Sequence, residues 1–228
     1  MELIIIIISI ISIIILNILM SSNIKKMKEI ATNEKLNKLT EKYPSNIEIC
    51  KELLENVDNK NVKIEENVNS EATLYIAISN KILIGNMHNS FTRIQTIAHE
   101  CLHSIQDRKL LIFNFVFSNI YFLYYIICCI LIILKYLPNE LLFLNIFLIL
   151  SFIYYTIRIF LENDAMIKAE YLSKQYLEEK NISNKIEIKE IVKGFKDLNK
   201  EIIKSTNVNL FTKIMTKVVI FNLLALIF

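Results

Sequence analysis

The sequence predicts a mainly α-helical membrane protein, with about four transmembrane helices and a small cytoplasmic α+β domain. Two observations about its make-up support this. Hydrophobic residues form 54% of the 228 residues, and the chain has only two glycines, two prolines and no tryptophan. Four long apolar runs alternate with segments that hold most of the charge. Such a chain is too apolar for an ordinary soluble domain.

The first apolar run, 3–20, predicts a transmembrane anchor over residues 1–20. Glu2 stands where a cleaved signal would be basic, which favours a retained anchor. The runs 110–134 and 141–160 predict a transmembrane hairpin over residues 110–160, with a turn at Pro138. The last run, 211–228, carries Lys213 and Lys217 one helical turn apart and is expected to be a transmembrane or an interfacial helix.

The placement of basic residues predicts the orientation. Segment 21–109 carries thirteen lysines and arginines and segment 162–210 carries nine, whereas the tip of the hairpin carries one, Lys135. By the positive-inside rule both long segments are cytoplasmic. We therefore expect a multi-pass protein of the cell membrane whose polar domain lies on the cytoplasmic side.

The first cytoplasmic segment, 21–109, shows signals for helices and a strand hairpin. Helical spacing of apolar residues covers 24–42, and Ser45 with Glu48 predicts a capping box that opens a second helix. The β-branched run 72–79 and the following 82–85 predict a hairpin or a strand with a short return.

A further helix is predicted from 91 to about 109, with Ser90 as its N-cap. The expected buried face of this helix consists of Phe91, Ile94, Ala98, Cys101 or Leu102, and Ile105. The second cytoplasmic segment, 161–210, is predicted to form helices over 162–179 and 186–204.

The helix predicted over 91–109 carries the sequence His99-Glu100-Cys101-Leu102-His103. Side chains at positions i and i+4 share one face of a helix, so both imidazoles can reach one metal ion. Neutral imidazole suits Zn²⁺, and a catalytic zinc has three protein ligands and an open position for water. Glu100 is then placed to take a proton from that water as a general base.

The third ligand comes from a limited supply, because the chain has three histidines. The hairpin returns the chain to the same side of the membrane at 161–165, Leu-Glu-Asn-Asp-Ala, so Glu162 is the expected ligand. Asp164 is then a carboxylate that orients an imidazole. Asp164 or His88 as the third ligand, or two acids that cap a helix start, stay open as alternatives.

These motifs resemble the YugP-type neutral zinc metallopeptidases of bacterial membranes. The segment "IAHECLHSIQD" (97–107) is similar to that family's A-A-H-E-x-G-H-A-I-Q pattern, and "LENDA" (161–165) to its E-F-D-A; Leu102 replaces the usual glycine. The order of anchor, zinc helix, hairpin and acidic motif also agrees. The chain looks more distantly similar to the HtpX and CAAX prenyl protease group. The resemblance implies His99, His103 and Glu162 as ligands of one zinc ion, and Glu100 as catalytic base.

The expected fold of the polar domain is therefore zincin-like, and the expected activity is that of a gluzincin-like zinc endopeptidase. Zinc-activated water would hydrolyse peptide bonds of membrane or membrane-proximal proteins. In zinc peptidases of this type, an edge strand beside the helix aligns an extended substrate. The alternative is a catalytically inactive, protease-like binding or regulatory membrane protein. Expected partners are a protein or peptide substrate and the lipid bilayer; the charge pattern indicates no nucleic-acid partner.

Overall fold

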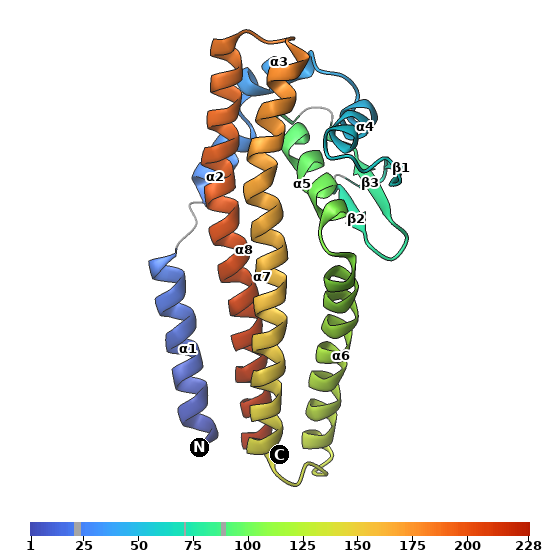
Figure 1. The fold of residues 1–228 in the computed structure, drawn as a ribbon. Helices are drawn as coiled ribbons and strands as arrows, with labels where there is room; N and C mark the ends of the chain where they lie inside the picture. The colour runs from blue at the N-terminus through green and yellow to red at the C-terminus, as the bar shows by residue number, and fades with distance from the viewer. Residues whose placement is uncertain (21–23, 71, 88–89) are drawn as a thin grey trace. The chain divides into compact units, whose positions relative to one another are not determined.

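The computed structural model describes residues 1–20, 24–70, 72–87 and 90–228 (Figure 1). Within these residues the chain is mainly helical and contains one three-stranded sheet, which confirms the predicted fold class at this level. The chain divides into two compact units. One comprises 1–22, 113–160 and 204–228, and the other comprises 23–112 and 161–203. We call them the apolar unit and the polar unit.

In the part of the chain that the structure describes, four helices are long and apolar enough to cross a membrane: α1 (Glu2–Leu19), α6 (Arg108–Ile133), α7 (Glu140–Lys180) and α8 (Lys185–Ile227). The number agrees with the prediction, and the last apolar run belongs to one of the four. The helices predicted over 162–179 and 186–204 are not separate elements. The first continues the apolar run 141–160 as part of α7, and the second continues into the apolar run 211–228 as part of α8. No proline lies within α7 or α8 to interrupt them.

Aromatic side chains hold the apolar unit together. Tyr121 on α6 stacks on Phe147 of α7 with ring centroids 5.3 Å apart, and Val218 and Phe221 of α8 are buried in the same cluster. The Nζ atom of Lys217 lies 4.4 Å from the Tyr121 ring centroid, so this lysine sits over aromatic faces.

The polar unit begins with three short helices, α2 (Ile24–Ala31), α3 (Glu34–Glu41) and α4 (Asn46–Asn56). The helix predicted over 24–42 is interrupted at Asn33, whose side chain accepts a hydrogen bond from the Leu36 amide and starts α3. The capping box predicted at Ser45 is confirmed. The Ser45 hydroxyl accepts from the Glu48 amide at 3.3 Å, and the Glu48 carboxylate accepts from the Ser45 amide at 3.0 Å.

The sheet consists of β1 (Lys63–Asn67), β2 (Leu74–Ile76) and β3 (Lys81–Gly85) in the order β1-β3-β2. Strands β2 and β3 pair antiparallel, as the predicted hairpin requires, with Asn80 at a positive φ of 47° in the turn. Strand β1, which pairs parallel to β3, was not predicted. Strand β2 thus lies at one edge of the sheet.

Helix α5 (Arg93–Ile105) forms the centre of the polar unit, and strands β2 and β3 lie against it (Figure 1). It starts later than predicted, with Thr92 rather than Ser90 at the N-cap. It also ends earlier, because Gln106 is extended, so α5 does not continue into α6. Ile105 was expected to be buried but is 48% exposed; the apolar part of the buried face ends with Leu102, and His103 after it is also buried.

Candidate metal centre

The local sequence of α5 places its two histidines on a defined face. Ile94, Ile97, Ala98 and Cys101 are fully buried in the core of the polar unit, which they share with residues of α4, α7 and α8. This burial fixes the rotation of α5 about its axis. His99 and His103 are therefore held on the face that turns away from this core, one helical turn apart.

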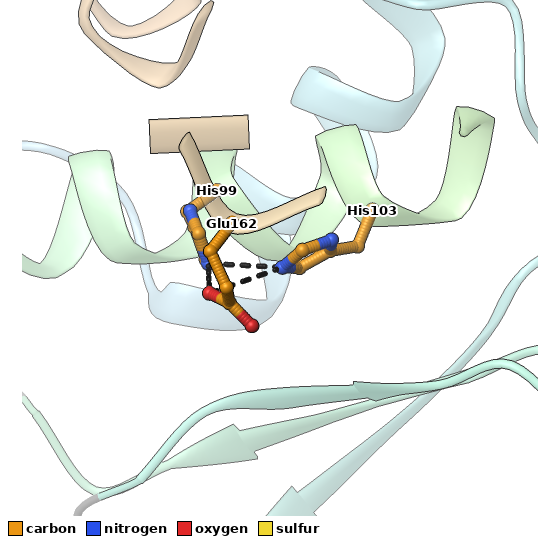
Figure 2. A group of neighbouring side chains, drawn as sticks. All are labelled: His99, His103 and Glu162. Carbon is orange, nitrogen blue, oxygen red and sulfur yellow. Dashed lines mark hydrogen bonds and ion pairs between the residues drawn. The ribbon is translucent and has the colours of Figure 1, made fainter. Parts of the chain in front are cut away.

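The carboxylate of Glu162 on α7 joins the two imidazoles (Figure 2). The Nε2 atoms of His99 and His103 are 3.0 Å apart. The Oε2 atom of Glu162 lies 3.6 Å from Nε2 of His99 and 3.9 Å from Nε2 of His103. Their side chains are between 11% and 18% exposed, so the group is mostly screened from water yet reachable from it.

This group has the composition and spacing of a metal site. Two imidazoles and one glutamate are the ligand set of one class of catalytic zinc centres. Ligand bonds of about 2.0–2.2 Å in a tetrahedral arrangement leave donor atoms about 3.3–3.6 Å apart. The observed separations of 3.0 to 3.9 Å lie on both sides of that value. The residues therefore fit a divalent transition metal held by these three side chains.

Glu100 lies beside this group and is held by the sheet. Its Oε2 atom accepts a hydrogen bond from the backbone amide of Tyr75 on β2 at 2.6 Å, and its Oε1 atom lies 3.9 Å from Nε2 of His99. Burial raises the pKa of Glu100, against the opposing effect of the nearby histidines and the Tyr75 amide. One oxygen is thus anchored, and the other faces the imidazoles.

Gln106, the first residue after α5, connects His103 to α7. Its Oε1 atom lies 2.8 Å from Nδ1 of His103, so the imidazole can donate to it. Its Nε2 atom donates to the Leu161 carbonyl at 2.9 Å and to the Asp164 carboxylate at 3.0 Å. A partner on Nδ1 sets the tautomer that leaves the Nε2 lone pair free for a metal. Sequence reasoning missed this residue, although the quoted family pattern also ends in glutamine.

Asp164 was expected to orient an imidazole, and it does so only through Gln106. Its other oxygen lies 2.6 Å from Nζ of Lys168, one turn further along α7. Partial burial opposes the charged form of Asp164, but the bonds to Lys168 and Gln106 outweigh it and lower the pKa of Asp164. The open alternative that Asp164 is the third ligand receives no support from this arrangement. His88, the other alternative, lies outside the described residues.

The remaining residues of the motif face the core. Cys101 is fully buried, with its sulfur 3.9 Å from that of Cys50 on α4, and Leu102 is 6% exposed. The bulk of Leu102, at the position where the resembling family has glycine, is therefore accommodated away from the histidines.

In comparisons with known proteins, no family model, curated protein or solved structure matches this chain. Any assignment of function therefore depends on the chemistry of the site and on the sequence motifs that form it.

Proposed function

We propose that this chain is a membrane-anchored zinc endopeptidase. The observation that carries the proposal is the convergence of His99, His103 and Glu162, from two helices distant in sequence, with the carboxylate of Glu100 next to them. Hydrolysis of a peptide bond needs a held metal and a base on the same side of it, and this group supplies both.

The chain's own residues have distinct tasks in this chemistry. Zinc, when bound, would polarise the peptide carbonyl and make a water molecule acidic near neutral pH. Glu100 accepts the proton from the attacking water and passes it to the leaving amine. The Tyr75 amide holds Glu100 in position for both transfers, because it bonds the oxygen that does not face the histidines. Gln106 keeps His103 in its metal-binding tautomer.

The sheet offers a means of positioning an extended peptide. Strand β2 lies at its edge, and the bond from the Tyr75 amide to Glu100 brings this edge to the base. A peptide that lies along this edge is therefore brought next to the catalytic carboxylate, while the Tyr75 amide itself stays bonded to Glu100. This favours a peptide substrate over a small metabolite.

The likeness of the two motifs to YugP-type metallopeptidases supports the same assignment. With four helices apolar enough to span a membrane, the protein acts on membrane or membrane-proximal substrates. The distribution of lysine and arginine supports a site on the cytoplasmic face.

Metal content and hydrolysis, measured together on the purified full-length chain, test the proposal. Wild type should hold about one zinc per chain, Glu162→Ala should lose it, and Glu100→Gln should keep it. Cleavage of a quenched fluorescent peptide library should fall about 10²–10⁴-fold in Glu100→Gln, which removes only the base.

The outcomes separate the alternatives. Absence of zinc from wild type, after zinc has been supplied, contradicts the proposal. Zinc retained in Glu162→Ala would move the third ligand to Asp164 or His88. Zinc binding in wild type without any cleavage that depends on Glu100 would identify an inactive protease-like binder.

A further inference from the structure

A cavity of about 550 Å³ adjoins the candidate metal centre inside the polar unit. It is lined by α2, α5, α7 and α8, and His99 is one of its lining residues. The volume lies within the range of sites that enclose small ligands. Its apolar wall includes Met27, Ala31, Met166, Ala169, Leu198 and Ile202. Any group that fills the cavity is consequently a direct neighbour of a metal ligand.

Gln95 gives this cavity a polar group without a partner. Its side chain lines the cavity and is 8% exposed, and its Nε2 atom has no hydrogen-bond partner among the described residues. A buried amide without a partner is rare and costly, and it calls for an explanation such as a ligand. Gln95 lies one helical turn before His99 on α5, so its donor and the metal ligand share one face.

We propose that this cavity binds a large apolar side chain of the peptide substrate, next to the bond that is cut, and that Gln95 donates to a backbone carbonyl of the same substrate. The inference rests on the proposed function and names the class of residue that the site selects. Charge supports it, because Lys28 is the only formally charged side chain among the described lining residues and it is exposed. The interior therefore disfavours a charged side chain.

The unpartnered donor favours a peptide over a lipid chain as the occupant. A hydrocarbon chain has no acceptor along its length, whereas a peptide presents a carbonyl at every residue. The wall would bury the side chain, while Gln95 would pair with the carbonyl beside it. Both features of the cavity are then used by one ligand.

Two metal-chelating probes test this without any need for turnover. The full chain, loaded with Co²⁺ in lipid nanodiscs, is titrated with acetohydroxamate and with an isobutyl-succinyl hydroxamate methylamide, and binding is read from the Co²⁺ absorption. The first probe reports on the metal alone. The second adds a branched apolar side chain and an amide carbonyl. Each buried carbon strengthens binding about fourfold, so the four carbons of the isobutyl group should make the second probe bind about 250-fold more tightly.

Three variants assign this gain to the cavity. Ala31→Phe fills the cavity from α2 and should reduce the gain at least tenfold. Gln95→Leu removes the donor and should reduce it about fivefold, the effect of one hydrogen bond. Glu29→Phe adds the same bulk at an exposed position of α2 outside the cavity, and it should keep the full gain.

The two levels of the proposal fail in different ways. If acetohydroxamate does not bind, the metal centre is wrong, and the inference falls with it. If acetohydroxamate binds but the isobutyl probe gains nothing, the metal centre stands and the cavity inference is overturned. A phospholipid found in wild type by native mass spectrometry and expelled by Ala31→Phe, with no gain for the isobutyl probe, would assign the cavity to lipid instead.

Discussion

Helix α5 carries two polar clusters that are both largely buried but differ in the hydrogen bonds they make. At its first turn, Arg93 is 2% exposed and donates to four oxygens within the chain. Its Nη1 atom bonds the Pro44 carbonyl and the Asn46 side chain at 2.8 and 2.9 Å. Its Nη2 atom bonds the Thr40 and Tyr43 carbonyls, each at 2.9 Å.

At its last turns, α5 presents the histidines of the candidate metal centre. There, three groups that can offer lone pairs, from His99, His103 and Glu162, point toward one another across 3.0 to 3.9 Å. Arg93 donates to oxygens that would otherwise be buried without a donor, whereas the histidines and Glu162 place three possible metal-binding atoms close together. The comparison indicates that the Arg93 cluster serves stability, and it agrees with the metal-binding role that we propose for the other cluster.

The largest stability effect is expected from Arg93→Met. This change leaves four acceptors without their donor. These oxygens stay buried without a hydrogen bond, which should cost at least about 3 kcal/mol of unfolding free energy. The measurement is the midpoint of thermal unfolding of the metal-free protein, followed by circular dichroism. Glu162→Ala is the matched control and should lower that midpoint less, because the side chains of this group are 11% to 18% exposed and water can reach the groups that the change leaves behind. Equal losses in the two variants would refute the distinction between the clusters.

A smaller effect is expected from Gln106→Leu, which removes the bridge between His103 and Asp164 while it keeps a side chain of similar size. Loss of a partner that orients a metal-binding histidine typically weakens metal affinity about 10–100-fold. Competition with a zinc chelator measures it. The stability of the metal-free protein should change little, since Gln106 is only partly buried.

Gln106→Glu serves as the companion variant. It keeps an acceptor for Nδ1 of His103 but loses the donor to Asp164 and the Leu161 carbonyl. Its zinc affinity should fall between that of wild type and Gln106→Leu. Unchanged zinc affinity in both variants would show that Gln106 does not orient the imidazole.

The elements that the sequence could predict are those that depend on patterns of neighbouring residues. An apolar run as long as a bilayer is thick needs no tertiary information, and neither do two histidines four residues apart. The capping box at Ser45 is equally local. Glu162 lies far from the histidines in sequence, but the predicted hairpin, which would return the chain to the side it left, made it the expected third ligand. The structure brings these three side chains together.

The elements that escaped prediction depend on tertiary contacts. Strand β1 is mostly exposed and lacks an apolar alternation, so only its pairing with β3 defines it. Arg93 bonds mainly to backbone carbonyls. Every residue has a carbonyl, so the sequence does not show which ones Arg93 will bond. The role of Gln106 follows from the exact residue at which α5 ends, and helix ends are poorly defined by periodicity.

The smallest effect is expected at the capping box, where the polar partners are also satisfied within the chain but are exposed to water. Ser45→Ala should cost about 1 kcal/mol of unfolding free energy, since water replaces part of what the hydroxyl supplied. Ser45 directly follows Pro44, whose carbonyl accepts from Arg93, so the two sites share one turn of backbone. A double-mutant cycle between Ser45→Ala and Arg93→Met, read by the unfolding midpoint, should therefore show coupling of at least about 0.5 kcal/mol. Strict additivity would mean that the capping box does not help to hold the carbonyls around Arg93.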